Sequence, residues 1–339
     1  MSAVKIDFSA MVEQATKNQE RQRPCCRADS IIIDANNLLY RLAHMEAKDP
    51  QRVARVFMEK ALMLSNWYGS IPQWTHVVWE GDSKNNWRFE YHPEYKATRK
   101  VSGDPDLRAC VRASELIVRE FLSYTVFPQW DPVRSEGDDG FATLARMTAE
   151  KLPGSSIGIY STDRDLLQLS CMENVLLIVP QRGAPDIAMG RADVVEKFGV
   201  TPEQLLDVKA LEGDAGDNIP GVKGIGKKFA TAIVQNFGNF NCLVEALEEG
   251  ALDQRENETN KDYRERLKKN GLTETRLGHI KRDLELAKMS FTVGAIRHDV
   301  QLDRIGKKEP KDLTEEFSFI TSSDYLNRYH ENFLLEEKK

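Results

Sequence analysis

Short apolar segments alternate with longer amphipathic segments through the first half of the chain. Runs of mainly β-branched and aromatic residues that end at turn-forming residues or Pro predict five strands, at 31–34, 75–82, 123–130, 156–163 and 173–180. Between them, apolar residues recur at three- and four-residue spacing and predict helices, at 53–68, 107–121 and 138–151. This alternation predicts an α/β fold with a mainly parallel twisted sheet and helices on both faces.

From about residue 190 the pattern changes to helices joined by tight turns. Helices are predicted at 192–198, from a capping box at 201–204 to about 211, and from about 227 onward. The turn before the last of these helices is rich in glycine and contains Gly221, Gly224 and Gly226. A short glycine-rich turn between two helices is the pattern of a helix-hairpin-helix.

The remainder of the chain begins with a polar stretch. Residues 250–271 are almost all polar, which favours a solvated or partly mobile insertion. Helical periodicity resumes at Leu277, Ile280, Leu284 and Ala287, and the final EEKK is expected to be a frayed tail. We therefore expect a leader, an α/β domain, a helix-hairpin-helix region and a C-terminal segment, at 1–28, 29–190, 191–300 and 301–339.

Composition narrows the class of protein. The 339 residues allow about two folding units. No apolar stretch is long enough to cross a membrane, and the N-terminus lacks the apolar core of a secretory signal, so we expect a soluble cytoplasmic protein. The five cysteines are scattered without zinc-ligand spacing. The net charge of −6 argues against a broadly basic nucleic-acid-binding surface, so any nucleic-acid site must be local.

Acidic residues follow several of the predicted strands. Ligands bind outside the carboxyl ends of strands in open α/β sheets, and Asp34, Asp82 and Asp163 each end such a strand. Because 53 of the 339 residues are acidic, their shared placement is more informative than any single one. The candidate acids are Asp34, Asp82, Glu136, Asp138, Asp139, Asp163, Asp165, Asp214 and Asp217.

Such a cluster requires cations. Two carboxylates about 5 Å apart repel by roughly 3 kcal/mol at an effective dielectric near 20. Oxygen ligands without His or Cys suit Mg²⁺ or Mn²⁺, and two such ions suit phosphodiester hydrolysis. The alternative for each acid alone is a helix cap or a surface charge, and capping is a serious competitor for Glu136, Asp138 and Asp139 because they precede a helix.

Basic residues and aromatic rings alternate directly after Asp82. This segment contains Lys84, Arg88, Lys96, Arg99 and Lys100, interleaved with Trp87, Phe89, Tyr91 and Tyr95. Rings stack on any base and cations follow the backbone, which suits single-stranded nucleic acid. The alternative is an ordinary amphipathic surface helix.

The glycine-rich turn has a different expected role. Its backbone N–H groups and the following helix N-terminus can bind phosphate without reading sequence. We therefore expect a phosphate contact from Lys223, Gly224, Gly226, Lys227 and Lys228. The alternative is a glycine-rich helix connection, but the run GVKGIGKK with helices on both sides is more specific than G-x-G alone.

Several segments, in family order, resemble the 5′-nuclease superfamily of flap endonucleases and 5′→3′ exonucleases. The resemblance is greatest to the standalone bacteriophage enzymes and to the 5′-nuclease domain of bacterial DNA polymerase I. The matching segments are IIIDANNLLYR (31–41), GDSKNNWRFEYHPEYKATRK (81–100), EGDD (136–139), YSTDRDLLQL (160–169) and FGVTPEQLLDVKALEGDAGDNIPGVKGIGKKFA (198–230).

The resemblance implies a PIN-like 5′-nuclease fold with a helical arch at about 84–112. It places the nine candidate acids on the family's metal site, some acting through water, with Asp82 chosen over Glu80 at the end of the second strand. It also implies that Lys96 and Arg99 contact the scissile phosphate, that Tyr95 stacks on the terminal base, and that Arg88 lies on the DNA-binding segment. The hairpin would grip duplex and bind K⁺ through the carbonyls of Val222 and Ile225.

The expected function is therefore that of a standalone Mg²⁺-dependent 5′→3′ exonuclease and flap endonuclease. Its substrates would be DNA 5′ ends, flaps or RNA–DNA primers during replication, in a bacterial or phage-infected cell. We expect a monomer, with replication proteins such as a single-stranded DNA-binding protein as candidate partners. The alternatives are a PIN-type ribonuclease, which usually lacks the hairpin, and a non-catalytic DNA-binding protein, which loss of several acids would have favoured.

Overall fold

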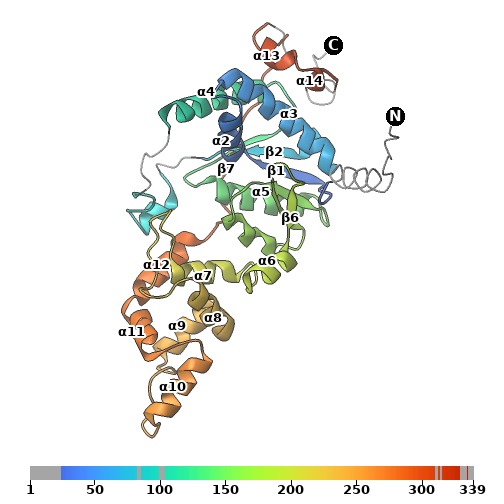
Figure 1. The fold of residues 1–339 in the computed structure, drawn as a ribbon. Coiled ribbons are helices and arrows are strands. Elements are labelled where there is room, and N and C mark those ends of the chain that lie inside the picture. The colour runs from blue at the N-terminus through green and yellow to red at the C-terminus, as the bar shows by residue number, and fades with distance from the viewer. Residues whose placement is uncertain are drawn as a thin grey trace, which may run out of the picture.

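A central sheet organises the first half of the chain in the computed structural model (Figure 1). The structure describes residues 24–81, 85–98, 104–309, 312–313, 315–328 and 334. Within these residues the sheet has seven strands in the order β6-β5-β4-β1-β2-β3-β7. The strands are β1 (Ser30–Asp34), β2 (Thr75–Val78), β3 (Gln129–Pro132), β4 (Ile157–Tyr160), β5 (Val175–Val179), β6 (Ile187–Met189) and β7 (Leu302–Arg304).

The pairing of the strands confirms the predicted mainly parallel sheet. The central strands β5, β4, β1, β2 and β3 are parallel, and only the edge strands β6 and β7 pair antiparallel to their neighbours. Parallel strands need long crossover connections, and the intervening segments supply them as helices. The carboxyl ends of β1, β2, β3 and β4 therefore meet at one edge.

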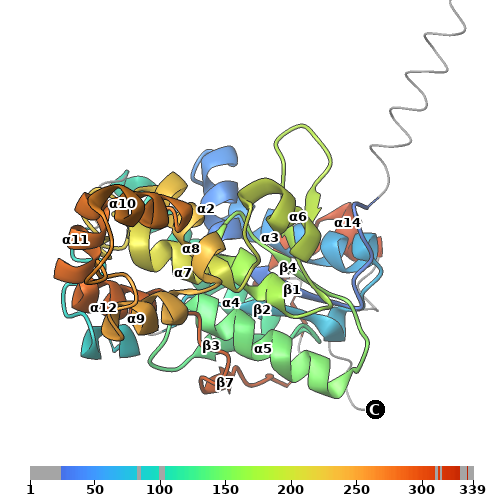
Figure 2. The same ribbon diagram turned by 90° about the horizontal axis from the view of Figure 1, so that it is seen from below.

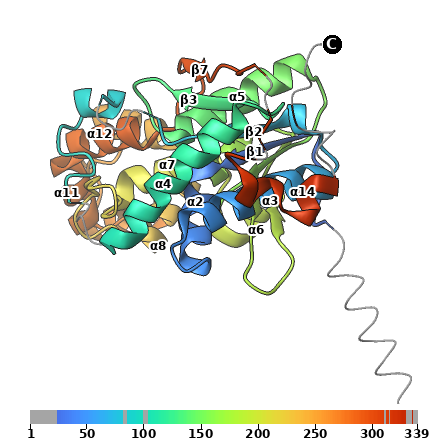
Figure 3. The ribbon, with the colours of Figure 1, turned by 90° about the horizontal axis from the view of Figure 1, so that it is seen from above.

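Helices cover both faces of this sheet. Strand β1 shows the division, because Ile31 and Ile33 pack into one apolar cluster and Ile32 into another. The first cluster includes residues of α2 (Ala35–Met45), α3 (Pro50–Tyr68) and α4 (Pro105–Leu122), and these helices lie together on one side of the sheet in Figure 3. The second includes α5 (Gly137–Lys151) and residues of α6 (Arg191–Phe198).

Several strand boundaries differ from the prediction, and the edge strands β6 and β7 are not among the predicted strands. The predicted strand at 123–130 is displaced, because β3 begins only at Gln129. The apolar residues Tyr124 and Phe127 are buried in the preceding loop, so they gave a strand-like pattern without being in a strand. Strand β2 ends at Val78.

The second half of the chain forms a helical group beside the sheet (Figure 2). It has its own apolar core, centred on residues such as Leu211, Ile233, Phe240 and Ile280. Its helices are α7 (Gln204–Glu212), α8 (Lys227–Phe237), α9 (Phe240–Glu248), α10 (Asn260–Lys269), α11 (Glu274–Arg282) and α12 (Leu284–Gly294). Helix α6 ends at Phe198 and is capped by Gly199, as predicted, with a φ of 72° at Gly199 that favours glycine.

The polar stretch 250–271 is largely exposed and contains a helix that its composition does not predict. Helix α10 lies within it, and Leu267 on that helix is fully buried in the helical core. Arg266 ion-pairs with Glu258 and donates to the carbonyl oxygens of Ala251 and Asp253. A few buried contacts and a local polar network therefore hold a segment of very low mean hydropathy.

The C-terminal segment returns to the sheet. After β7, helices α13 (Ser318–Thr321) and α14 (Asp324–Arg328) contact α3, and Phe317 and Ile320 are buried. The predicted frayed tail EEKK lies outside the described residues, as does most of the leader 1–28. Among the helices that the structure describes, none combines the length and apolar character needed to cross a membrane.

Candidate active site

A pocket of about 410 Å³ opens at the carboxyl edge of the sheet. It lies where the strand ends, the first turn of α5 and the loop after α7 meet. Eight carboxylate side chains line it, and these are Asp34, Glu80, Glu136, Asp138, Asp163, Asp165, Asp214 and Asp217. The structure thus brings together seven of the nine acids named from the sequence and adds Glu80.

Asp34 reaches this pocket because it both ends β1 and caps α2. One carboxylate oxygen accepts from the backbone N–H of Asn37 at 2.9 Å, and the other accepts from the hydroxyl of Ser161 at 2.6 Å. Burial raises the pKa of Asp34 to about 7, and the nearby Glu80 and Asp163 carboxylates act in the same direction.

The pKa values of Asp138 and Asp163 are also raised. Burial raises the pKa of Asp138 well above its usual range, and the Asp163 and Glu136 carboxylates add to that shift. Burial also raises the pKa of Asp163, against the hydrogen bond that its carboxylate accepts from the N–H of Asp165 at 2.9 Å. The pocket therefore holds more negative charge than its own cations neutralise.

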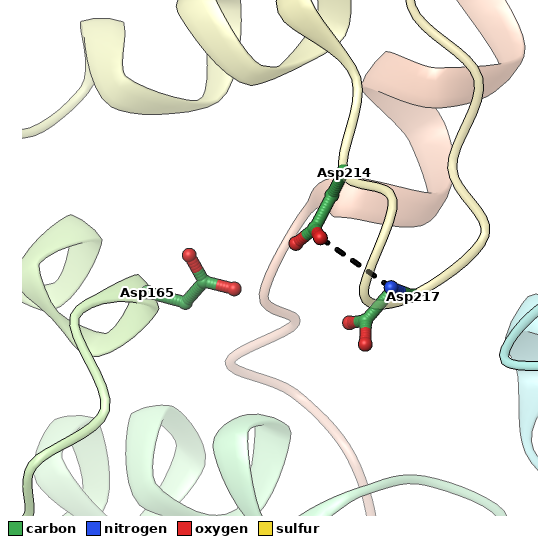
Figure 4. Close-up of side chains that lie close together, drawn as sticks. All are labelled: Asp165, Asp214 and Asp217. Carbon is green, nitrogen blue, oxygen red and sulfur yellow. Dashed lines mark hydrogen bonds between the residues drawn. The ribbon is translucent and has the colours of Figure 1, made fainter. Parts of the chain in front are cut away.

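The loop after α7 presents Asp214 and Asp217. Asp214 and Ile219 exchange two backbone hydrogen bonds of 2.8 Å each, which closes the loop. A Cβ at Gly221 would lie 2.0 Å from the Glu212 carbonyl oxygen, so only glycine fits this crossing. Oxygen atoms of Asp165, Asp214 and Asp217 lie within 4.8 Å of one another and face a common space in Figure 4, an arrangement that could hold a metal ion.

Lys209 of α7 is a site residue that the sequence reasoning missed. Its Nζ lies 2.6 Å from an oxygen of Asp165 and 2.9 Å from one of Asp214. Burial would lower the pKa of Lys209, but these two carboxylates outweigh burial and raise it. The available signal was a lysine among buried residues of a helix, five positions before Asp214.

Glu136 links the pocket to the basic segment. Its carboxylate accepts from Nζ of Lys96 at 2.5 Å and from the hydroxyl of Tyr95 at 3.0 Å. Tyr95 is buried and its hydroxyl also lies 3.3 Å from Asp217. This differs from the expectation that Tyr95 stacks on a terminal base, because the ring is enclosed by protein and the hydroxyl joins two acids.

Asp139 and Arg88 lie outside the pocket, which corrects their expected roles as metal ligand and DNA contact. They form a buried bidentate pair, with N–O distances of 2.7 and 3.0 Å. The Asp139 carboxylate also accepts from Trp87 Nε1 and from the backbone N–H of Arg297. With these partners in a fully buried position, Asp139 joins the basic segment to α5 and to the chain after α12.

The basic segment is anchored to the loop that carries Asp217. The backbone N–H of Lys96 donates to the carbonyl of Asp217 at 2.8 Å, and the Asn218 side chain donates to the carbonyl of Glu94 at 2.7 Å. Residues 85–98 form a short 3₁₀ helix, Trp87–Glu90, and turns. The expected helical arch over 84–112 is therefore helical only in part among the described residues, chiefly in α4.

Four residues singled out from the sequence lie outside the described residues, namely Asp82, Lys84, Arg99 and Lys100. The sequence favours Asp82 over Glu80 as the acid after the second strand. Glu80 lines the pocket and accepts a hydrogen bond from the Asn36 side chain at 3.0 Å. Glu80 is thus a further candidate ligand.

The glycine-rich hairpin connects α7 to α8. Val222 and Ile225 are buried, and Gly224 has a φ of 78° that the turn requires. The side chains expected to meet phosphate, Lys223, Lys227 and Lys228, are all exposed. Gly226 caps α8, so the backbone N–H groups at the start of this helix follow the turn directly.

The chain matches known family models over most of its length. Residues 29–199 match the family described as 5′-3′ exonuclease, N-terminal resolvase-like domain, and residues 200–305 match 5′-3′ exonuclease, C-terminal SAM fold. The chain is 34% identical over 219 residues to a 5′-3′ exonuclease of Aquifex aeolicus, covering 63% of this chain and 71% of that protein. It is 30% identical to DNA polymerase I of Bacillus subtilis over 66% of this chain.

Solved structures share the fold of this chain. A zinc-bound T5 5′-exonuclease superposes with a TM-score of 0.60 at 22% identity, covering 78% of this chain and 88% of the T5 chain. The catalytic core of Rad2 in complex with DNA gives a TM-score of 0.52 at 16% identity, covering 92% and 93% of the two chains.

The matches span both halves of the molecule. The chain belongs to the 5′-3′ exonuclease family, and the expected fold and enzyme class are confirmed. The matched region corresponds to only 25% of the B. subtilis polymerase, so that protein's other activities are not carried over.

Proposed function

We propose that this chain is a divalent-metal-dependent nuclease that hydrolyses DNA phosphodiesters at 5′ ends and 5′ flaps. The observation that supports it most strongly is the gathering of eight carboxylates in one open pocket. Mg²⁺ is the proposed ion and Mn²⁺ an acceptable substitute, because every candidate ligand is a hard oxygen donor.

The residues fit divalent cations on electrostatic grounds. Burial and neighbouring carboxylates raise the pKa of Asp34, Asp138 and Asp163, and bound cations would offset both effects. Asp165, Asp214 and Asp217 would hold one ion, and acids nearer the strand ends would hold another. Bound ions would polarise the scissile phosphate and supply an activated water.

Lys96 would then serve the phosphate. Its ammonium is partly exposed in the pocket beside Glu136, and its backbone is fixed to Asp217. A cation held there would stabilise negative charge that develops on the phosphate oxygens. We propose the same role for Arg99 from the family resemblance.

The hairpin would hold the duplex. Lys223, Lys227 and Lys228 are exposed around a turn and a helix N-terminus, which suits sequence-independent phosphate contact. A K⁺ ion on the carbonyls of Val222 and Ile225 remains a proposal that rests on the resemblance. The T5 flap endonuclease, whose structure with DNA and metal ions has the same fold, supports DNA as substrate.

The cellular role is proposed from relatives. Bacterial 5′-3′ exonuclease and polymerase I relatives support a place in replication or RNA primer removal in a bacterial or phage-infected cell. A monomer that meets replication proteins, such as a single-stranded DNA-binding protein, is the simplest arrangement for such an enzyme.

A substrate panel tests this function. The purified protein is incubated with 5′-labelled flap, nicked and RNA-primed duplexes, with Mg²⁺ or with EDTA, and the products are sized. We expect Mg²⁺-dependent cleavage near the junction of the flap and release of short products from nicks. Equal cleavage of internal single-stranded RNA would instead favour a PIN-type ribonuclease, and DNA binding without cleavage would favour a non-catalytic protein.

A further inference from the structure

A second pocket, of about 620 Å³, lies between α8 and the turn that joins α10 to α11. Its apolar surface includes Phe229 and Ala232 of α8 and the buried Leu272. It shares no lining residue with the carboxylate pocket among the residues that the structure describes. The pocket is therefore separate from the proposed active site.

Cations surround this apolar surface. Lys228, Arg264, Lys268 and Arg276 all line the pocket, and the Arg276 guanidinium lies 3.3 Å from the centre of the Phe229 ring. Arg264 is partly neutralised by Glu274 at 2.7 Å. Within the described part of the chain, Lys228 and Lys268 are exposed and form no ion pair. The rim therefore carries positive charge in a protein whose net charge is −6.

An apolar floor with a cationic rim favours some negatively charged macromolecules over others as ligands of this pocket. Duplex DNA could meet the rim cations with its phosphates, but it has no apolar side group to fill the floor. A peptide can supply both, with an apolar side chain in the pocket and carboxylates against the rim. We propose that this pocket, the α8–α11 pocket, binds an acidic segment of a partner protein through one apolar anchor.

The α8–α11 pocket overlaps the proposed DNA-binding hairpin at one residue. Lys228 lines the pocket and is also one of the hairpin lysines proposed to contact duplex. A bound acidic segment would therefore compete with DNA at Lys228 while leaving the carboxylate pocket open. The docking proposal does not depend on catalysis, because none of its residues lies in the carboxylate pocket.

Fluorescence anisotropy with three labelled peptides tests the proposal on the full chain. The first has four aspartates followed by leucine and phenylalanine, the second replaces the aspartates with asparagines, and the third replaces the apolar pair with two serines. We expect the first to bind with a Kd on the order of 10–100 μM at low salt, and each of the others at least about five-fold more weakly. Equal binding of all three, or no binding, would overturn the proposal.

A pair of charge-reversal variants locates the site. Lys268→Glu changes the rim, whereas Lys261→Glu makes the same charge change on α10 outside the pocket lining. Both lysines are exposed, and circular dichroism checks that both variants fold. We expect Lys268→Glu to weaken the first peptide at least about five-fold and Lys261→Glu to leave it within two-fold.

The same variants separate a peptide site from a DNA site. If Lys268→Glu lowers affinity for a long duplex while the first peptide fails to bind, the α8–α11 pocket belongs to the DNA surface and the proposal is wrong. If both variants weaken the peptide equally, the attraction is only to net charge, which also overturns it. Flap cleavage by Lys268→Glu at saturating enzyme should match that of the unchanged protein in either case.

Discussion

The Nζ atom of Lys209 lies 2.6 Å from a carboxylate oxygen of Asp165, at the edge of the proposed metal site. The same ammonium reaches Asp214 at 2.9 Å. Two acids from different parts of the chain thus share one partly buried counter-ion. Lys209 reduces their mutual repulsion in the absence of metal, and it limits how much negative charge remains for an ion.

Replacing Lys209 with Met should lower the stability of the metal-free protein and increase its stabilisation by Mg²⁺. Because the acids of these ion pairs are partly exposed, removing the lysine should cost on the order of 1 kcal/mol, and the metal-free variant should unfold at a lower temperature. Added Mg²⁺ should raise its melting temperature more than that of the unchanged protein, since a cation replaces the lost charge. Lys209→Arg is the control. Equal melting temperatures for Lys209→Met and the unchanged protein without metal would contradict this role.

Asp163→Asn should greatly reduce cleavage without lowering the stability of the metal-free protein. An amide removes a ligand charge and relieves repulsion from the neighbouring acids, so the metal-free melting temperature should stay level or rise. Cleavage should fall by at least about 10²-fold, while duplex affinity measured in Ca²⁺ should change little. Asp299→Asn, an exposed aspartate outside the pocket, is the control. A marked drop in stability would mean that Asp163 has a structural role instead.

Lys96→Ala should act on the rate constant of the chemical step. Single-turnover cleavage at saturating enzyme should slow by about 10²-fold or more, with a much smaller change in the Kd for the same flap. The exposed Lys151→Ala on α5 should affect neither quantity. If Lys96→Ala alters only the Kd, the lysine attracts DNA and has no contact specific to the transition state.

The Arg88 and Asp139 pair should be important for folding. Arg88→Met leaves a buried carboxylate without its bidentate partner and should lower the free energy of unfolding by about 3–5 kcal/mol in urea titrations. Arg134→Met, which breaks the exposed pair with Glu90, should cost about 1 kcal/mol or less. Comparable losses in the two variants would show that the buried pair contributes no more to stability than the exposed pair does.

The raised carboxyl pKa values predict how metal-free stability depends on pH. Asp34 holds its proton in the folded state up to pH about 7, whereas in the unfolded chain it loses the proton near its ordinary value of 3.8. The folded state therefore binds more protons between these values, and the free energy of unfolding should fall as pH rises through that window. Asp138 and Asp163 act in the same direction.

Thermal melts with and without Mg²⁺ check this dependence. The metal-free protein should melt at a higher temperature at pH 5.5 than at pH 7.5, and Mg²⁺ should stabilise it mainly at pH 7.5 because ligands must lose their protons. Asp34→Asn should reduce the slope. A metal-free melting temperature that increases steadily from pH 5.5 to 7.5 would be inconsistent with the raised pKa values.

The sequence predicts the parallel strands β1, β2, β4 and β5 and most of the carboxylate pocket, but it misplaces β3 and does not reveal the edge strands β6 and β7. Asp34 and Asp163 follow strands whose apolar pattern is strong, and parallel strands bring their carboxyl ends together. Adjacent residues in a helix point about 100° apart, so Asp138 and Asp139 cannot face the same space. Their pattern could not show which one enters the pocket, since that depends on where Arg88 packs.

Other features depend on tertiary contacts that a single sequence does not reveal. Tyr95 looks like an exposed stacking residue, and only its burial against Glu136 and Asp217 shows otherwise. Lys209 becomes notable only when α7 is placed beside Asp165. Helix α10 has few apolar residues, so its fold follows from Leu267 and the Arg266 network more than from periodicity.

The dependence of single-turnover flap cleavage on Mg²⁺ tests the central claim most directly. A 5′-labelled flap duplex is mixed with saturating protein, Mg²⁺ is titrated from zero, and the unchanged chain is compared with Asp138→Asn. The account predicts no cleavage in EDTA, a rate that rises and saturates with Mg²⁺ for the unchanged chain, and a loss of at least about 10²-fold for the variant. Cleavage that persists in EDTA, or an Asp138→Asn rate within a few fold of the unchanged chain, would contradict it.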